Sequence, residues 1–340
     1  MTRKGSGRMS APIDVPPTST ARAAAEDALA GTGKTIEGRS LGQIAWARLK
    51  RDKVAITGGI VVIFLLLVAI AAPILNSLGV IDPNDFNQGL INPTLSAPTG
   101  AMGGISWAHP FGVEPINGRD LFSRTIVGAS NSLLIALLAT LLSMVIGVVL
   151  GLLAGYAGGW VDTLISRIMD IFLAFPILLF AISLTGVVQD KAFGLSGYWL
   201  HVAVLAFVIG FFNWPYIGRI IRGQTLSLRE REFVDAARSM GGRTGYILFR
   251  ELLPNLVAPI LVYSTLLIPT NILFEAALSF LGVGFHPPTA SWGGMLSQAV
   301  HLYSVDPEFM VVPGVAIFIT VMAFNLLGDG LRDALDPRSR

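Results

Sequence analysis

The sequence LLIALLATLLSMVIGVVLGLLAG, residues 133–155, contains no charged side chain and decides the fold of this chain. A bilayer core about 30 Å thick is crossed by about 20 apolar residues in a helix, so the run predicts a membrane-spanning helix. Five more stretches have the same character, at about 54–75, 168–188, 199–217, 256–283 and 309–328. A soluble core would rarely supply six such runs. The sequence therefore predicts an all-α membrane protein with six transmembrane helices.

The composition supports a membrane protein. Hydrophobic residues make up 53% of the 340 residues and charged residues only 14%, whereas soluble domains carry about a quarter charged residues. The lack of cysteine excludes disulfides, thiolate metal sites and cysteine nucleophiles. Residues 1–40 are polar and rich in Ala, Gly, Ser and Pro, which predicts a disordered cytoplasmic tail.

The positions of lysine and arginine predict the orientation of the helices, because positively charged loops stay in the cytoplasm. One side of the membrane would hold both ends of the chain and the loops after the second and fourth stretches, and 21 lysines and arginines lie there. The loops after the first, third and fifth stretches hold only 3. Both termini, with residues 336–340, are therefore predicted to be cytoplasmic. Residues 76–125 become an extracytoplasmic segment, which either caps the outer mouth or is a passive loop.

The cytoplasmic loop 218–254 has the strongest local signals. The motif SLRE at 227–230 is a capping box, in which a hydroxyl and a carboxylate each satisfy a free amide at a helix start. A helix over about 228–240 is therefore predicted, and Gly241-Gly242 gives it a permissive stop. A second short helix, about 245–252, is predicted to end before Pro254.

The helix predicted over 228–240 is amphipathic. Its apolar residues recur at i, i+3, i+4 and i+7 and form one stripe: Phe233, Ala236, Ala237 and Met240. A short helix of this kind suits a groove on another protein, and a helix lying on anionic lipid is the alternative. Two small alanines anchor poorly in a membrane, so protein docking is favoured.

The segment EFVDAARSMG at 232–241, followed by Leu253-Pro254, resembles the EAA loop of bacterial ABC importer permeases. The resemblance implies a coupling helix that sits in a cleft of a separate ATPase subunit. The residues that it assigns to this contact are Glu232, Phe233, Asp235, Ala236, Ala237, Met240 and Gly241. Two positions depart from the pattern: Asp235 replaces the first Glu, and Glu251 occupies the usual Ile position before Leu-Pro.

Other segments resemble the C subunits of dipeptide and oligopeptide permeases. They are HPFG at 109–112, NGRD at 117–120, GLLAGY at 151–156, DIFLAFP at 170–176, LSFLG at 278–282, PP at 287–288 and FNLLGDGLRD at 324–333. The resemblance implies a type I ABC importer permease of the bacterial inner membrane. An amphipathic lead-in and first helix would occupy 41–75, and a core of five helices 126–335.

The same resemblance implies the partners and the cargo. The protein partners are a homologous second permease subunit, two ABC ATPase subunits and an extracytoplasmic peptide-binding protein. This chain itself would contact membrane lipid, and no nucleic acid is expected to bind it. The cargo is a dipeptide or oligopeptide, and nickel chelates or glutathione are the alternatives. ATP-driven closure of the ATPases would move the coupling helix and open the cavity outward.

ATP is not expected to bind this chain. The segment GTGKT at 31–35 resembles the end of a phosphate-binding loop, but the full pattern needs a glycine where Ala28 stands and a strand before it. ATP and Mg²⁺ are therefore assigned to the partner ATPases. No cofactor and no catalytic residue is assigned to this chain, which is predicted not to be an enzyme.

Polar residues inside the spans are costly there and are candidates for function. Glu275 could line the translocation pathway and attract an ammonium terminus, or it could form a helix–helix hydrogen bond. Asn213 and Asn271, with Asn325, are further pathway candidates, although interhelical hydrogen bonds are favoured for them. Asp170 is expected to pair with Arg167.

Three prolines are predicted to interrupt spanning stretches: Pro176 the third, Pro215 the fourth and Pro269 the fifth. The four histidines show no metal-ligand spacing, so no metal site is assigned.

Two functions remain as remote alternatives. An intramembrane carboxyl hydrolase would use Asp170 and Glu275, which lie in no known protease motif, and a non-transporting scaffold would not need the coupling helix.

Overall fold

The computed structural model describes residues 41–100, 102–187, 191–192 and 194–335, so the predicted tails at 1–40 and 336–340 lie outside it. The chain divides into a unit Met1–Gln43, of which only the start of one helix is described, and a compact unit Ile44–Arg340. Every contact discussed below belongs to the second unit.

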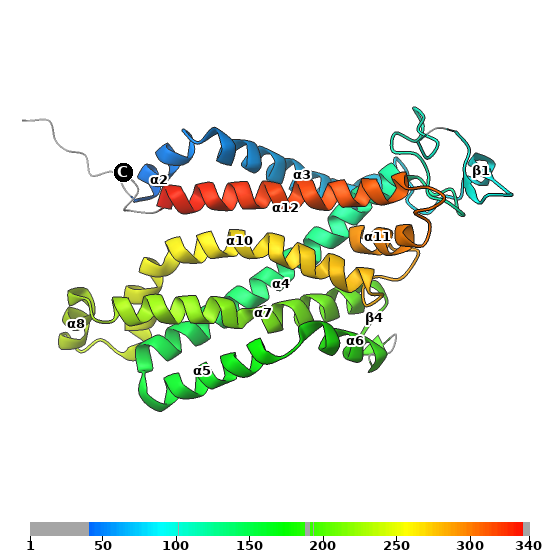
Figure 1. Cartoon of the computed structure of the whole chain (residues 1–340). Helices are drawn as coiled ribbons and strands as arrows, with labels where there is room; N and C mark the ends of the chain where they lie inside the picture. Colours follow the sequence, from blue (N-terminus) through cyan, green and yellow to red (C-terminus); the bar gives the residue numbers. More distant parts are fainter. Residues whose placement is uncertain (1–40, 101, 188–190, 193, 336–340) are drawn as a thin grey trace, which may run out of the picture. The chain divides into compact units, whose positions relative to one another are not determined.

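The described part is mostly helical (Figure 1). The helices are α2 (Leu41–Leu49), α3 (Lys53–Ser77), α4 (Leu121–Ala157), α5 (Gly159–Ala174), α6 (Ile177–Val187), α7 (Tyr198–Leu228), α8 (Glu232–Ser239), α9 (Thr244–Tyr246), the π-helix η2 (Ile247–Leu252), α10 (Leu253–Phe280), α11 (Trp292–Val300) and α12 (Glu308–Leu335). A 3₁₀ turn, η1, covers Gln88–Leu90. The short strands form two antiparallel pairs. One is β1 (Ile91–Asn92) with β2 (Ala97–Pro98), and the other is β3 (Lys191–Ala192) with β4 (Leu195–Ser196).

Five helices in the described residues are long and apolar enough to cross a membrane: α3, α4, α7, the continuous rod 244–280 and α12. The sixth span, predicted as one helix over 168–188, is instead the pair α5 and α6, bent by 77°. The break lies at Phe175, whose backbone is extended, because the residue before a proline avoids helical geometry. The predicted interruptions at Pro215 and Pro269 are wrong, since both lie inside continuous helices.

The centre of the bundle is the close contact of α4 with α7. Three glycines spaced four residues apart face α7: a β-carbon would come within 2.8 Å of it at Gly147, 2.7 Å at Gly151 and 2.6 Å at Gly155. Small residues at this spacing let membrane helices approach through their backbones. The motif GLLAGY therefore serves helix packing at both of its glycines.

Helices α3 and α12 pack against each other and α12 also packs against α10 (Figure 1). The contact is close at Gly58, where a β-carbon would lie 2.8 Å from the carbonyl oxygen of Ala323. The opposite face of α3 exposes large apolar side chains such as Ile63, Phe64 and Leu67. An exposed apolar stripe on a spanning helix is the surface expected against lipid.

The end of the bundle that carries residues 78–120 and 281–307 is called the outer end here, after the orientation that the charges predict. Helix α8 and the end of α12 lie at the opposite end (Figure 1). The predicted outer segment 76–125 is too long, because Asp120 caps α4 by accepting from the Ser123 amide at 2.7 Å. Residues 121–125 are therefore the first turn of α4.

The outer segment, residues 78–100 and 102–120, is called the outer cap below, and a buried ion cluster joins its end to α4. Glu114 lies between Arg119, which donates to its Oε1, and Arg124, whose Nε is 3.3 Å from Oε2. All three side chains are buried. His109 Nδ1 lies 3.0 Å from Asp120 Oδ1, so the HPFG and NGRD motifs meet at the start of α4.

Candidate functional site

Loop 218–254 begins differently from its prediction. Helix α7 continues to Leu228, and the Arg229 amide donates to the Thr225 carbonyl at 2.9 Å. Ser227 therefore lies inside a helix, and the predicted capping box is wrong. Helix α8 starts at Glu232 and has 8 residues, with no side-chain cap at Arg231. The residues of the box favour a helix end locally, but the packing of α7 against α4 extends the preceding helix through them.

The predicted glycine stop of α8 is confirmed. Gly241 has a φ of +81°, a backbone conformation that glycine adopts without strain. The amides of Gly241 and Gly242 donate to the carbonyls of Arg238 and Ala237, both at 2.9 Å. These bonds satisfy carbonyls that the helix end leaves free.

The predicted apolar stripe of α8 does not form one outward face. Ala237 is buried together with Val234, which the sequence analysis missed, in a cluster that includes Ile221, Ile247 and Leu252. Ala236 is exposed, and Met240 is 82% exposed. Phe233 is partly buried and packs against the same cluster, so the buried side of α8 carries Phe233, Val234 and Ala237. The element packed against α8 determines which side is buried.

The exposed face of α8 carries Glu232, Asp235, Ala236 and Met240. Two further apolar side chains of the same loop are exposed, Tyr246 and Phe249, although no periodicity in the sequence singles them out. The exposed residues of α8 lie at the end of the bundle opposite the outer cap (Figure 1).

The second half of the loop does not stop at Pro254. Residues 244–280 form one continuous rod of 37 residues, in which η2 leads into α10. The predicted helix end is wrong because Pro254 falls in the first turn of α10, after a wider π-helical turn. Val234 and Ala237 pack on the start of this rod, so α8 is mechanically joined to α10.

Several arginines of the loop are anchors to neighbouring helices. Arg222 donates twice to Asp162 of α5, at 2.5 and 2.7 Å, and Arg229 donates to the Gly155 carbonyl at 3.0 Å. The guanidinium of Arg238 lies over the Tyr156 ring, 5.3 Å from its centre. These contacts fix the loop to the corner between α4 and α5.

Asp170 has two arginine partners. The predicted pairing with Arg167 is confirmed at 3.8 Å, and Arg219 of α7 lies closer, at 2.5 Å. Asp170 is half-exposed between them.

Glu275 is fully buried in α10, where the Ser279 hydroxyl donates to its carboxylate at 2.7 Å. Ser132 of α4 and Ser291 before α11 also face the Glu275 carboxylate. Glu275 thus has the helix–helix role that the sequence allowed, and its assignment to the pathway stays a prediction.

The two asparagines form the predicted interhelical hydrogen bonds. Asn213 of α7 donates to Asn271 of α10 at 2.9 Å, and Asn271 donates to the Thr140 hydroxyl of α4 at 2.8 Å. The chain of amides ties three spanning helices together. Asn325, in contrast, is exposed on α12.

A groove of about 340 Å³ runs between α7 and α10 beside this network. It is lined by Asn213, Tyr216, Ile217, Ile220, Tyr263, Leu266, Leu267, Thr270 and Phe274. Tyr216 and Thr270 are exposed within the spans, where polar groups usually face protein or water. None of the lining side chains is charged.

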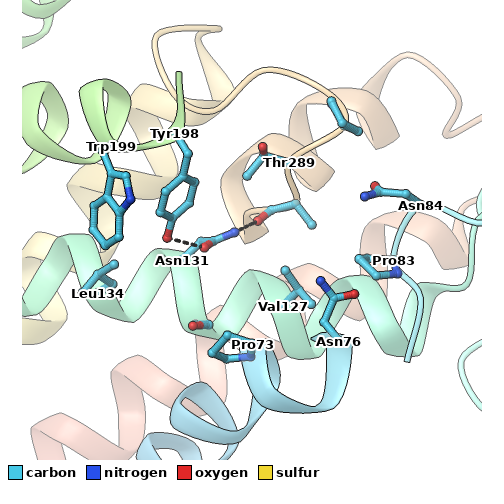
Figure 2. Close-up of a pocket in the computed structure, with 13 residues that line it drawn as sticks. Pro73, Asn76, Pro83, Asn84, Val127, Asn131, Leu134, Tyr198, Trp199 and Thr289 are labelled. Carbon is cyan, nitrogen blue, oxygen red and sulfur yellow. Dashed lines mark hydrogen bonds between the residues drawn. The ribbon is translucent and has the colours of Figure 1, made fainter. Parts of the chain in front are cut away.

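A second groove, of about 500 Å³, lies at the outer end. Its lining residues are Pro73, Asn76, Pro83, Asn84, Val127, Ser130, Asn131, Leu134, Tyr198, Trp199, Pro288, Thr289 and Ala290. Figure 2 shows Asn131 at its centre: Tyr198 donates to the Asn131 amide oxygen at 2.9 Å, and the amide nitrogen donates to the Ala290 carbonyl at 2.6 Å. This lining is also uncharged, and it is rich in amides and aromatic rings.

Family models match two parts of the chain. One, described as "Binding-protein-dependent transport system inner membrane component", matches residues 147–340. Another, described as "N-terminal TM domain of oligopeptide transport permease C", matches residues 40–97.

Curated relatives and one solved structure agree with these matches. The chain is 40% identical over 296 residues to the dipeptide transport system permease protein DppC of Alkalihalophilus pseudofirmus, covering 87% of this chain and 90% of that protein. It is 43% identical over 293 residues to the glutathione transport system permease protein GsiD of Shigella flexneri serotype 5b, covering 86% and 89%. An inward-facing structure of the MetNI methionine ABC transporter matches with a TM-score of 0.50 at 18% identity, over 64% of this chain and 98% of that chain, which establishes the fold alone.

Proposed function

The chain belongs to the family of binding-protein-dependent transport system inner membrane components, and from that membership we propose that it imports dipeptides or oligopeptides. It is a multi-pass permease subunit of an inner-membrane ABC transporter and not an enzyme, which removes the hydrolase alternative. Permeases of this family act with an ATPase and a substrate-binding protein, and generally with a second permease. The proposed complex has two ATPase subunits, a homologous permease and an extracytoplasmic peptide-binding protein.

The lining of both grooves supports a peptide cargo. Amides, hydroxyls and aromatic rings can exchange hydrogen bonds with a peptide backbone, and a transport path must bind its cargo weakly enough to release it. A fixed charge in the groove would bind the oppositely charged terminus of a zwitterionic peptide strongly and would slow its release. Glutathione is itself a peptide and shares this chemistry, so it remains the first alternative, and nickel chelates the second.

The observation that carries the coupling mechanism is the packing of α8 on the rod 244–280. Val234 and Ala237 contact Ile247 and Leu252 at the start of the rod, and Tyr263 and Thr270 further along it line the groove against α7. A push on α8 is thus transmitted along one continuous helix to the groove wall. Closure of the ATPases would move α8, tilt α10 and change which side of the membrane the groove faces.

Docking of the ATPase is assigned to the exposed side of α8. Met240→Glu places a charge at the most exposed apolar position of this surface, while Gln224→Glu adds the same charge at an exposed position of α7. We expect Met240→Glu to reduce co-purification of the ATPase by on the order of 30-fold, as for an interface hot spot. Gln224→Glu should leave it unchanged. Equal retention of the ATPase by both variants rejects the docking assignment.

Substrate class is tested separately from docking. The complete transporter, reconstituted in proteoliposomes with its binding protein, would be given labelled dipeptide, oligopeptide, glutathione or a nickel chelate. We expect peptide uptake that falls in the Tyr216→Ala variant while ATPase association stays normal, because Tyr216 lines the groove and is remote from α8. Uptake of the nickel chelate alone would reject the peptide assignment and leave the coupling proposal standing.

A further inference from the structure

Two histidines from distant parts of the sequence meet at the outer end. His201 lies in the first turns of α7, and His286 lies in the segment that joins α10 to α11. Their ring centres are 5.3 Å apart, with the ring planes at 64°. His286 is exposed and His201 is partly exposed, so both rings can be reached by solvent.

The hydrogen bonding of His201 fixes which ring nitrogen is available. Its Nδ1 lies 2.9 Å from the Gly197 carbonyl oxygen, which can only accept a hydrogen bond. Nδ1 must therefore carry the proton, and in the neutral imidazole Nε2 presents a free lone pair. A histidine that binds a metal usually donates its other N–H to a carbonyl or carboxylate in this way.

The residue before His286 is held in place from α7. Phe285 is buried and stacks on Tyr198, with ring centres 5.4 Å apart and planes within 10°. The His201 ring also lies 6.4 Å from the Phe285 ring. This packing anchors the backbone at His286 beside the start of α7 and keeps the two imidazoles together.

We propose that His201 and His286 form a binding site for a divalent transition-metal ion such as Zn²⁺ or Ni²⁺, with water completing the coordination. Two imidazoles on a tetrahedral ion with metal–nitrogen bonds of about 2.1 Å have ring centres about 5 Å apart, which matches the observed spacing. Imidazole is a preferred ligand of Zn²⁺, Ni²⁺ and Cu²⁺. The described residues contain no group of three or more His, Cys, Asp or Glu that could hold a metal, so this is a two-ligand site.

A bound ion would join the start of α7 to the segment between α10 and α11. Both of these elements line the outer groove, through Tyr198 and Trp199 on one side and Pro288 and Thr289 on the other. The ion would hold the two walls at a fixed distance. This inference rests on the histidine geometry and does not depend on the cargo proposed above.

Zn²⁺ binding to the purified transporter complex tests the site. We expect His201→Gln and His286→Gln each to weaken the binding of one Zn²⁺ per chain by at least about tenfold, measured by isothermal titration calorimetry. His301→Gln is the matched control, because His301 is an exposed histidine on the same outer side. Wild-type affinity in both single variants, or an equal loss in His301→Gln, would overturn the proposal.

A variant that gains a measurable signal distinguishes loss of a metal ligand from loss of Zn²⁺ binding caused by misfolding. The chain has no cysteine, so His286→Cys introduces a single thiol that can replace an imidazole as a ligand. With Co²⁺ as the probe, this variant should show a thiolate-to-metal absorption band that disappears when His201→Gln is added. A band that persists without His201 would show that His201 is not a ligand and would also overturn the proposal.

Discussion

The outer cap and the loop 218–254 both connect spanning helices, but they use charged side chains in opposite ways. The loop 218–254 is called the coupling loop below, after its proposed role. In the outer cap Glu114 and Arg119 are buried beside Arg124 of α4, whose side chain is fully enclosed. In α8 the charged residues Glu232, Asp235 and Arg238 are exposed, and the buried contacts are made by Val234 and Ala237.

Buried charges in the outer cap stabilise its fold, whereas the exposed charges of α8 form part of the protein surface. Charges buried in contact stabilise one arrangement strongly, because separating them leaves an unpaired charge in a low-dielectric interior. Exposed charges contribute little to stability and stay available to a partner. The cap is therefore expected to be rigid, and the exposed face of α8 agrees with the docking surface proposed above.

The largest effect should follow from Glu114→Gln, which leaves Arg119 and Arg124 buried without their carboxylate. We expect a loss of about 3–5 kcal/mol in the free energy of unfolding, measured as the fraction of folded protein that survives heating or denaturant in detergent. Glu230→Gln, at an exposed partner of Arg229, is the control and should be almost neutral. A change below about 1 kcal/mol for Glu114→Gln would mean that the cap does not depend on its buried charges.

The coupling loop should depend instead on its buried apolar pair. Val234→Ala removes packing from the cluster with Ile247 and Leu252, at a cost of about 2 kcal/mol. Hydrogen exchange of the amides in 229–246 should become roughly 30-fold faster. Asp235→Ala, at the exposed neighbour, should leave exchange unchanged. If Asp235→Ala has the larger effect, charges and not packing hold this loop.

A buried carboxyl group at the outer end predicts a pH dependence. Burial and the adjacent Glu308 raise the pKa of Asp306 from 3.8 to about 6. The folded state therefore binds this proton more tightly than the unfolded chain, and the resulting stability is present below pH 3.8 and lost as the pH rises through about 6.

Asp306→Asn should remove this dependence. At pH 8 the variant should be more stable than the wild type by about 1–2 kcal/mol, and near pH 4 the two should converge. Unfolding at several pH values measures the difference. A constant difference across this range would show that the Asp306 proton is not linked to folding.

The smallest effect should come from Asp170→Asn. This carboxylate is half-exposed between Arg219 and Arg167, so its loss should change the free energy of unfolding by less than about 1 kcal/mol, and less still at high salt. Unfolding at low and high ionic strength measures it. A loss as large as that of Glu114→Gln would erase the distinction between the two ends.

The sequence by itself determined the number of apolar stretches and the family. Span number follows from the length of helix that a bilayer requires, which is a property of consecutive residues. The stop of α8 at Gly241 was also predictable, because it depends on the backbone freedom of one residue. The motif at 232–241 predicted a coupling segment in the same local way, and that role stays a proposal.

Only the tertiary structure decided where helices break and which faces are buried. Pro176 lies at a bend whereas Pro215 and Pro269 lie within continuous helices, because α7 and α10 are held by neighbours on several sides. The contact of Ser132 with Glu275 and that of His201 with His286 involve residues far apart in the chain, and the buried side of α8 depends on residues of α7 and η2. Local periodicity describes a helix but not the surface against which it packs, and that surface determines the role of each side chain.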